Sequence, residues 1–435
     1  MNVCVLGLWH LGTVTAACLA SAGHDVIGLD FDARAVEALA TGKPPIFEPG
    51  LEELIGRGAG DGRLRFTSDP ADALAAADLL WVAYDTPVDD HDRADVDFVV
   101  ERVVGVLPHL RDGAQVLISS QVPAGTTARL ETVFASSARG RRVDFAYSPE
   151  NLRLGQALAA FTAPDRIIMG VRPGADRGRL EGLISPFTER IEWMSVESAE
   201  MTKHALNAFL ATSVTFINEV AALCEQVGAD AGEVARGLKS EPRIGPRAYL
   251  SPGGAFAGGT LARDIVFLSE LGQREHVPLS LLPSVKTSND AHREWPQRRL
   301  EQLLGTMAAR TIGVWGLTYK VGTDTLRRSS AVELCRWLVA QGASVRAHDP
   351  VVKSVVDDLV PLVPELALVR EPVEAAIGAS ALVVATPWPD YKAIDSGAVA
   401  AAMARPLVLD AARFLGRTLG ADSRLEYYSV GVRSR

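Results

Sequence analysis

The stretch that decides the fold lies at the start of the chain and reads Val3-Cys4-Val5-Leu6-Gly7-Leu8-Trp9-His10-Leu11-Gly12. It places a strand-length apolar run before a glycine turn, and a helical pattern follows from about Thr13 to Ala22. The next apolar run, Asp25–Leu29, ends at Asp30. A strand, a glycine turn, a helix, a second strand and an acid, in this order, are typical of a dinucleotide-binding unit.

The turn is an imperfect copy of the pattern Gly-x-Gly-x-x-Gly, because Trp9 stands at the middle glycine. The first glycine permits a tight turn, the last permits close packing of helix and strand, and the helix N-terminus offers N–H groups to a pyrophosphate. Asp30 has the spacing of an acid that binds a ribose hydroxyl, and it would repel the 2′-phosphate of NADP. A merely structural turn is the alternative. We expect NAD to contact Gly7, Trp9, His10, Leu11, Gly12 and Asp30.

Composition narrows the class of protein. The chain has 435 residues, which predicts two or three domains, and 48% of them are apolar and 22% charged, as in soluble globular proteins. A formal net charge of -9 argues against general binding to nucleic acids or to anionic membranes. The start lacks the basic segment of a signal peptide, and the four cysteines have no disulfide or metal-ligand spacing. We expect a reduced, cytoplasmic protein without a metal site.

The chain divides into three predicted domains. Strands and helices alternate over residues 1–194, which predicts an α/β domain with a doubly wound parallel sheet. Residues 195–300 are mostly helical, and Glu197–Val227 reads as one long helix, either a spine with a dimer surface or a core helix without a dimer role. Strands return over residues 301–435, at Thr311–Trp315 and beyond. The predicted fold is therefore two Rossmann-like domains joined by a central long-helix domain.

Many ordered stretches resemble the UDP-glucose/GDP-mannose dehydrogenase family, over nearly the whole chain. They are Gly23–Asp30, Phe47–Leu51, Thr86–Pro87, Val122–Thr127, Ser148–Arg153, Asn207–Thr212, Phe216–Glu219, Arg243–Pro246, Gly316–Lys320, Thr323–Asp324, Arg327 and Asp349–Pro350. The resemblance implies an N-terminal NAD domain, a central helical region that dimerises, and a C-terminal domain that holds the nucleotide. It also implies a homodimer and a nucleotide-sugar substrate.

The family oxidises the C6 alcohol of a nucleotide sugar to a carboxylate in two hydride transfers, the second through a thiohemiacetal on a cysteine. The family motif Gly-Phe-Gly-Gly-Ser-Cys-Phe-Pro-Lys-Asp matches Ala255–Asp264 here, and Thr260 stands at the cysteine position. A hydroxyl needs an adjacent base to attack a carbonyl, whereas a cysteine is partly thiolate and strongly nucleophilic. Gln121 replaces a family threonine and Leu154 a family acid, at positions that help to hold the catalytic water and the nicotinamide.

Other polar residues of the family site remain. Lys203 and Asn207 are four positions apart on one predicted helix, so they share a face, and they would stabilise a developing alkoxide. Asp264 would hold Lys203 or a water in a proton relay, and Glu150 is a candidate general base. Each could instead be a satisfied structural residue. The resemblance further assigns Thr86, Gln121 and Arg327 to the cofactor, and Leu152, Arg243, Phe256, Gly258 and Lys320 to the substrate.

The sequence therefore predicts an NAD-dependent dehydrogenase that oxidises an alcohol on a nucleotide sugar or related nucleotide, in a two-electron reaction. One alternative is a four-electron 6-dehydrogenase that acts through a free aldehyde hydrate. Another is a non-catalytic protein that binds a nucleotide sugar and keeps the fold. Trp9 and Thr260 favour the non-catalytic alternative, and Lys203, Asn207 and Asp264 oppose it.

Overall fold

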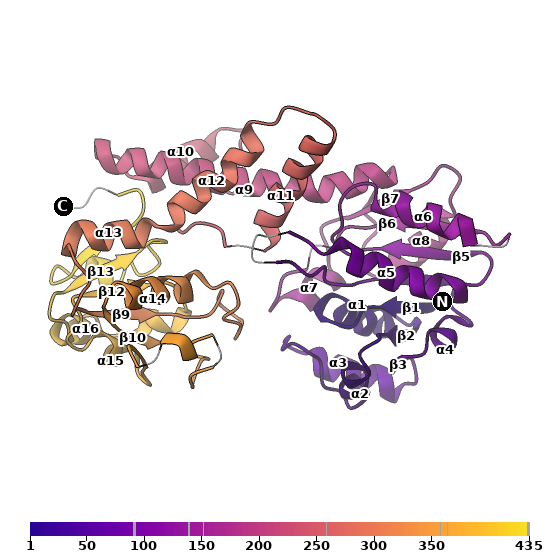
Figure 1. Cartoon of the computed structure of the whole chain (residues 1–435), viewed down its shortest axis with the longest axis horizontal. Helices are drawn as coiled ribbons and strands as arrows, with labels where there is room; N and C mark the ends of the chain where they lie inside the picture. The colour runs from indigo at the N-terminus through magenta and orange to yellow at the C-terminus, as the bar shows by residue number, and fades with distance from the viewer. Residues whose placement is uncertain are drawn as a thin grey trace. The chain divides into compact units, whose positions relative to one another are not determined.

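The structure is a computed structural model that describes residues 1–89, 93–137, 140–150, 152–257, 259–356, 358–362 and 364–432 (Figure 1). It divides into two compact units, Met1–Leu206 and Asn207–Arg435. The long helix α9 (Val196–Val227) contributes residues to both units.

The first unit is built on an eight-stranded sheet in the order β3-β2-β1-β4-β5-β6-β7-β8. Its strands are β1 (Asn2–Leu6), β2 (Asp25–Leu29), β3 (Leu64–Thr67), β4 (Leu79–Val82), β5 (Ala114–Ile118), β6 (Val143–Tyr147), β7 (Ile167–Val171) and β8 (Ile191–Met194). The inner strands β4 and β5 are buried along their whole length, as expected of parallel strands covered on both faces. The predicted doubly wound α/β fold is thereby confirmed for this unit.

One strand pair departs from the predicted parallel arrangement, because β6 and β7 run antiparallel. Parallel neighbours need a crossover that returns the chain to the starting edge of the sheet. The segment between β6 and β7 does not return, so it stays at the carboxyl edge and carries Glu150 and Leu152 there. The exception to the parallel pattern therefore lies beside the candidate site.

Helices cover both faces of this sheet. Helix α1 packs against α3 and α7 on one face, and α5 packs against α6 on the other (Figure 1). The helices are α1 (His10–Ser21), α2 (Ala33–Ala40), α3 (Leu51–Gly60), α4 (Pro70–Leu74), α5 (Val96–Val106), α6 (Thr126–Ser137), α7 (Ala157–Thr162) and α8 (Arg177–Ile184). Strands β1 to β6 are parallel, so they bring their carboxyl ends to one edge of the sheet, where α1, α5 and α6 begin, whereas β7 and β8 end at the opposite edge.

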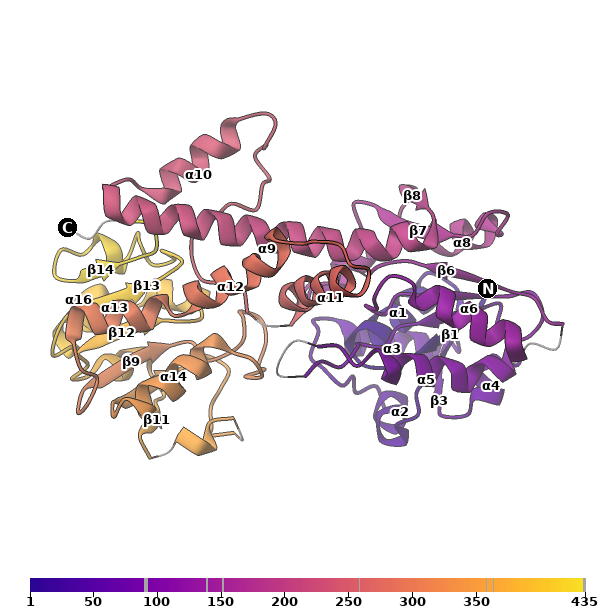
Figure 2. The ribbon, with the colours of Figure 1, turned by 45° about the horizontal axis from the view of Figure 1, so that its top comes forward.

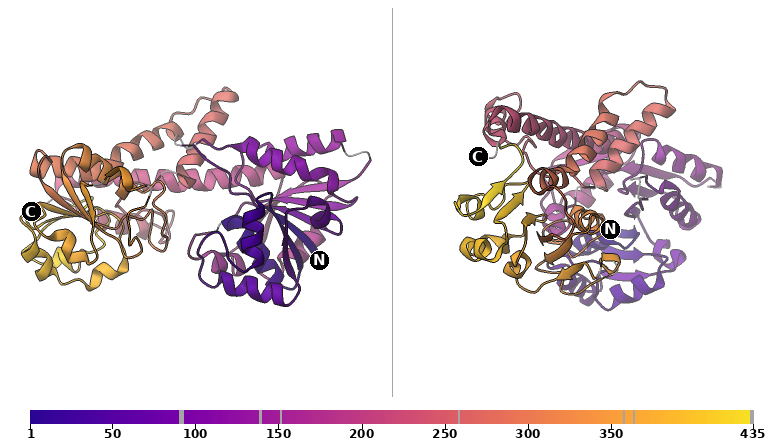
Figure 3. Two further views of the ribbon diagram at one scale, coloured as in Figure 1. Left: turned by 60° about the horizontal axis from the view of Figure 1, so that its bottom comes forward. Right: turned by 60° about the vertical axis from the view of Figure 1, so that its left-hand side comes forward.

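The second unit combines helices with a six-stranded parallel sheet in the order β11-β10-β9-β12-β13-β14 (Figure 2). The strands are β9 (Thr311–Trp315), β10 (Ser344–His348), β11 (Leu366–Leu368), β12 (Ala381–Val384), β13 (Leu407–Asp410) and β14 (Glu426–Tyr428). The helices are α10 (Ala231–Ser240), α11 (Thr260–Arg274), α12 (Leu281–Arg293), α13 (Trp295–Leu304), α14 (Ser330–Ala340), α15 (Pro372–Ala376) and α16 (Ser396–Ala402), labelled in Figure 1. Figure 3 shows the ribbon from two further sides. This sheet confirms the second Rossmann-like region.

Helix α9 is long and apolar enough to cross a membrane by length and composition. Its packing gives a different explanation of this composition, since Ala211, Ile217 and Ala221 are fully buried against the rest of the protein. Its polar residues Glu200 and Asn218 are buried as well, and both hydrogen-bond to other segments. The helix is therefore part of the protein core along much of its length.

The two sheets share one local construction. Gly7 N donates to Leu29 O at 2.9 Å in the first unit, and Gly316 N donates to His348 O at 2.8 Å in the second. In each case the turn after the first strand is held by an acid that follows the neighbouring strand, Asp30 or Asp349. The similarity of the two α/β halves, which the sequence only suggested, thus extends to individual hydrogen bonds.

Candidate functional site

The glycine turn between β1 and α1 is tightly packed. Gly7 has a φ of +93°, and a Cβ there would lie 2.7 Å from Tyr84 Cδ1. A Cβ on Gly12 would lie 1.6 Å from Gly7 O, so no side chain fits between the turn and the helix. Gly7 therefore permits the tight turn and Gly12 the close packing of helix and strand, as the sequence predicted. Trp9 is the N-cap residue of α1 and stays 51% exposed.

Asp30 closes this turn from the neighbouring strand. Its Oδ2 accepts a hydrogen bond from Leu8 N at 2.7 Å, and its Oδ1 accepts one from Asp32 N at 3.0 Å. The carboxylate therefore lies at the carboxyl edge of β2, where the dinucleotide pattern places it. The preference for NAD over NADP stays a prediction.

His10, at the first position of α1, pairs with the buried Glu48. His10 Nε2 lies 3.1 Å from Glu48 Oε2, and the same carboxylate accepts from Gly155 N and Ala157 N at 2.8 Å each. Glu48 thus ties the start of α1 to the segment after β6. Glu48 lies in one of the family stretches but was not predicted as a site residue. Besides His10, its partners are two main-chain amides far along the chain, which no sequence pattern displays.

The segment after β5, which carries Gln121, is fixed by two side chains from elsewhere. Thr86 Oγ1 donates to Gln121 O at 2.7 Å, and His204 Nε2 lies 2.9 Å from Val122 O. The structure therefore brings together Thr86 and Gln121, both predicted to contact the cofactor. His204 was not predicted, although its position next to Lys203 on α9 is a usable signal.

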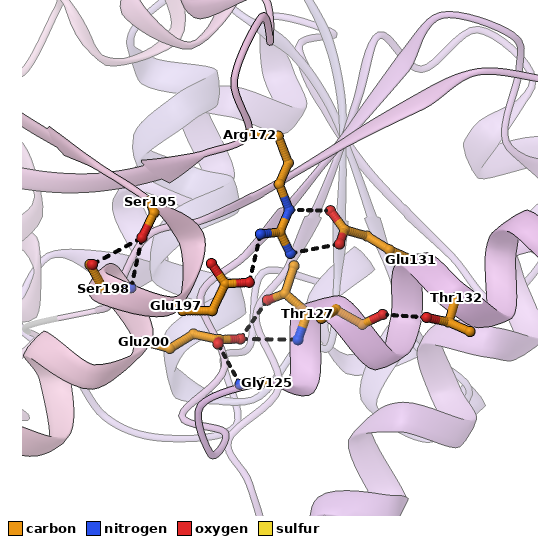
Figure 4. A network of polar contacts seen from close by, with 10 residues as sticks. Gly125, Thr127, Glu131, Thr132, Arg172, Ser195, Glu197, Ser198 and Glu200 are labelled. Carbon is orange, nitrogen blue, oxygen red and sulfur yellow. Dashed lines mark hydrogen bonds and ion pairs between the residues drawn. The ribbon is translucent and has the colours of Figure 1, made fainter.

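A second anchor of this segment is the fully buried Glu200 (Figure 4). Its carboxylate accepts hydrogen bonds from Gly125 N at 2.7 Å, Thr127 N at 3.0 Å and Thr127 Oγ1 at 2.7 Å. These amides lie at the N-terminus of α6, where a carboxylate is favoured by the helix dipole. Glu200 lies one helical turn before Lys203, so this contact fixes the part of α9 that presents the lysine.

An arginine next to this anchor joins three elements (Figure 4). Arg172, at the end of β7, donates to Glu131 of α6 from Nε at 2.8 Å and from a terminal nitrogen at 2.6 Å. Its other terminal nitrogen donates to Glu197 of α9 at 2.6 Å. These carboxylates raise the pKa of Arg172, and the guanidinium lowers the pKa of Glu197.

Lys203 and Glu150 form the central ion pair of the first unit. Lys203 is only 6% exposed, and its Nζ donates to Glu150 O at 2.5 Å and lies 3.3 Å from Glu150 Oε1. Glu150 Oε2 accepts from Leu152 N at 2.8 Å. Three predicted site residues thus meet at the carboxyl edge of the sheet, with a buried cation held by one carboxylate.

In the second unit, Asn207 and Asp264 form a buried pair. Asn207 Nδ2 donates to Asp264 Oδ2 at 2.5 Å, and Asp264 is fully buried. Thr260 is the first residue of α11, one turn before Asp264, and it is exposed. Gly259 precedes it with a φ of +101°. The residue at the family's cysteine position therefore presents a hydroxyl at a helix N-terminus.

The predicted substrate residues have different surroundings. The side-chain amide of Asn289 holds the main chain of Phe256: it accepts a hydrogen bond from Phe256 N and donates one to Phe256 O, both at 2.9 Å. Asn289 was not predicted as a site residue. The Arg243 side chain is 86% exposed and pairs with Glu241 at 2.9 Å. Gly258 lies outside the described residues.

Lys320 and Arg327 lie in one loop between β9 and α14. Tyr319 N donates to Thr325 O at 2.9 Å and closes the loop, with Lys320 half-buried and Arg327 exposed. The base of the loop is held by Asp349, whose Oδ2 accepts from Leu317 N at 2.7 Å. Sequence reasoning quoted Asp349 in a family stretch but gave it no site role.

The thiols lie in the core rather than at this site. All four cysteines are free and buried. Burial raises the pKa of Cys18 and of Cys335 to about 12, and it raises that of Cys4 further. Such thiols are poor nucleophiles at neutral pH. Among the described residues, no group of three or more His, Cys, Asp or Glu side chains is placed to hold a metal ion.

A doubly wound sheet with this turn and this acid at its carboxyl edge is typical of a dinucleotide-binding protein. Comparison with known families makes the class specific. Family models of the UDP-glucose/GDP-mannose dehydrogenases match in chain order: the NAD binding domain at residues 1–188, the central domain at 197–291 and the UDP binding domain at 313–417. The chain belongs to the UDP-glucose/GDP-mannose dehydrogenase family.

Individual relatives are similar to this chain over nearly its full length. A UDP-glucose 6-dehydrogenase of Pseudomonas aeruginosa is 34% identical to this chain, over 98% of this chain and 95% of the relative. One of Bacillus subtilis is 33% identical, covering 99% and 98%. The solved structure of a UDP-glucose dehydrogenase from Pyrobaculum islandicum matches with a TM-score of 0.87 at 31% identity, covering 99% and 98%. The family membership and the glycine cradle together support NAD as the cofactor.

Proposed function

We propose that this protein catalyses a two-electron, NAD-linked oxidation of an alcohol on a nucleotide sugar. The observation that carries the proposal is Thr260, which stands at the first position of α11 where the family has its cysteine. All four thiols are buried, and burial raises the pKa of Cys4, Cys18 and Cys335, so they are poor substitutes for the family's cysteine. The reaction then ends after one hydride transfer, with a carbonyl product.

The turn between β1 and α1 would hold NAD, which when bound would supply the acceptor for the hydride. Lys203 supplies a buried positive charge, oriented by Glu150, that stabilises the alkoxide developing on the substrate oxygen. Glu150 or a water accepts the alcohol proton. The Asn207–Asp264 pair holds its amide in one orientation toward substrate or water. These assignments are proposals that rest on family position and on the observed contacts.

Two alternatives lead to different products. A four-electron 6-dehydrogenase would hydrate the aldehyde without a covalent intermediate and oxidise it again, which yields a carboxylate. A non-catalytic homologue would bind the nucleotide sugar and NAD without turnover. The retained and paired Lys203, Asn207 and Asp264 favour catalysis.

The test uses UDP-glucose as the probe substrate, since this is the compound in the relatives' names. We expect one NADH per product, a carbonyl that can be trapped, and turnover that survives thiol-alkylating reagents. Lys203→Met should lower the rate by roughly 10²–10³-fold, because a preorganised charge is lost. Lys286→Met, which removes the partly exposed partner of Asp290, is the matched control and should leave the rate unchanged.

Other outcomes are equally clear. Two NADH per carboxylate together with a trapped thioester would overturn the mechanism, and so would full activity after loss of Lys203. Two NADH without a thioester would favour the hydrate alternative. NAD and UDP-glucose binding without turnover would favour the non-catalytic homologue.

We further propose a homodimer formed through α9, in a cytoplasmic protein. Exposed apolar side chains recur on this helix at Phe209, Phe216 and Leu223, which are 69%, 49% and 68% exposed, and Val227 follows at 77%. A seven-residue spacing places the first three on one face, as at a helix–helix seam. A second α9 would bury this stripe, and by family resemblance Arg243 would then complete the partner's site.

A further inference from the structure

The turn that is to receive the dinucleotide already faces two carboxylates of its own chain. Leu8 N donates to Asp30 Oδ2 at 2.7 Å, as the dinucleotide pattern expects. In addition, Leu11 N donates to Asp85 Oδ2 at 3.4 Å. Asp85 follows β4 by three residues, and β4 pairs with β1, so its side chain reaches the turn from the adjacent strand end.

Leu11 lies in the first turn of α1, a helix of 12 residues. This helix has no acid in its own first turn, and its N-cap residue makes no side-chain cap. Asp85 is therefore a carboxylate brought to this N-terminus from outside the helix. The first-turn amides of this helix are also the groups to which a dinucleotide-binding unit offers the diphosphate.

Trp9 departs from the dinucleotide-binding pattern at the same place. It replaces the glycine that normally lets the backbone approach the diphosphate, and it is the N-cap residue with a half-exposed indole. Gly7 and Gly12, by contrast, keep the tight geometry. The glycines that set the packing are thus kept, whereas Trp9 and the Asp85 contact both fall on the part of the turn that would approach the diphosphate.

We propose that Asp85 sets the cofactor affinity by competing with the diphosphate of NAD for the Leu11 amide. The carboxylate and the diphosphate are both anions, so they repel each other, and one N–H cannot donate fully to both. NAD binding then requires the Asp85 side chain to turn away from α1. The effect is specific to ligands that carry phosphate, and it rests on the NAD site described above.

The test compares Asp85→Asn with the unchanged protein by calorimetric titration of NAD, ADP and adenosine at low salt. Asparagine keeps the shape and removes the charge. We expect the dissociation constants of NAD and ADP to fall about tenfold, as for a close like-charge pair near a surface, and that of adenosine to stay the same. Raising the salt should shrink the difference, because the repulsion is screened.

Asp61→Asn is the matched control, since it removes one exposed charge at the C-cap of α3 and should leave all three constants unchanged. Asp85→Ala is a second variant in case the asparagine makes new bonds, and thermal melting checks that each variant is folded. Equal or weaker binding of NAD and ADP by both variants would overturn the inference. So would an equal gain for adenosine. Failure of NAD to bind even to the unchanged protein would instead overturn the cofactor assignment.

Discussion

At the scale of single residues, two buried charges of the first unit, Glu200 and Lys203, have fixed partners. Glu200 accepts three hydrogen bonds at the N-terminus of α6, and Lys203 is held by Glu150. A buried charge is tolerated only when it is paired and hydrogen-bonded. These contacts therefore fix the first turns of α9, which bear the proposed catalytic lysine, as well as stabilising the fold.

Glu200→Gln should destabilise the protein by about 1–3 kcal/mol, because its amide nitrogen cannot accept from the Gly125 or Thr127 groups that now face a carboxylate. Glu197→Gln is the control on the same helix, since its carboxylate is 49% exposed and its ion pair with Arg172 should contribute only about 0–1 kcal/mol. Urea unfolding measures both. Equal losses for the two variants would contradict the view that Glu200 is the anchor.

Stability should also depend on pH through the Glu197–Arg172 pair. The pKa of Glu197 is lower in the folded protein than in the unfolded chain, so its contribution is present above the unfolded value and is lost as the pH falls through the folded value. The contribution is small because the pair is partly exposed. In the Glu197→Gln variant this part of the acid dependence disappears, which the same unfolding experiment at several pH values will show.

At the scale of elements, the approach of α1 to the turn depends on Gly12. Gly12→Ala places a Cβ against the main-chain oxygen of Gly7, so we expect loss of NAD binding and a large destabilisation or failure to fold. Gly56→Ala is the control, because Gly56 lies within α3 with open space around it and alanine favours helix by about 0.5–1 kcal/mol. Calorimetric titration and thermal melting check both. Unchanged melting of Gly12→Ala would contradict the packing argument.

The elements also show what the sequence could and could not predict. Asp25–Leu29 and Thr311–Trp315 are confirmed to the residue, because continuous apolar runs bounded by turns mark buried strands. The first helix begins at His10 rather than near Thr13, since Gly12 lies inside it and reads as part of the turn. The strand Leu64–Thr67 was missed, because it lies at the sheet edge with only Leu64 buried.

In the candidate site, too, some residues were predicted from the sequence and others were not. The Lys203–Glu150 and Asn207–Asp264 contacts join residues that family motifs had already singled out. Glu48 and Glu200 were not predicted, because most of their partners are main-chain groups far along the chain, which no motif or periodicity displays. His204 was missed as well, although it lies next to Lys203. Asp85 is of the same kind, since its importance depends on the parallel pairing of β1 with β4.

At the scale of the whole molecule, α9 supplies Lys203 to the first unit and Asn207 to the second, and its apolar stripe remains exposed. Monomeric proteins rarely keep a large contiguous apolar patch in water. The stripe with its seven-residue repeat supports the proposed homodimer, in which a helix of a second chain would cover it. Because α9 contributes residues to both units, the oligomeric state has to be tested on the complete protein.

Phe216→Glu should convert the proposed homodimer into a monomer at micromolar concentration, because a carboxylate at the centre of the stripe would be buried without a partner. Val277→Glu is the control: it changes another exposed apolar residue of the second unit, 52% exposed and outside α9, and should leave the dimer intact. Sedimentation equilibrium gives the mass of each variant, and thermal melting shows whether the monomeric Phe216→Glu variant is still folded.

If Arg243 completes the partner's site, the Phe216→Glu monomer should still bind NAD but lose affinity for UDP-glucose, since the first unit carries the turn proposed to bind NAD. A strictly monomeric parent protein with full affinity for both ligands would remove the dimer from the mechanism.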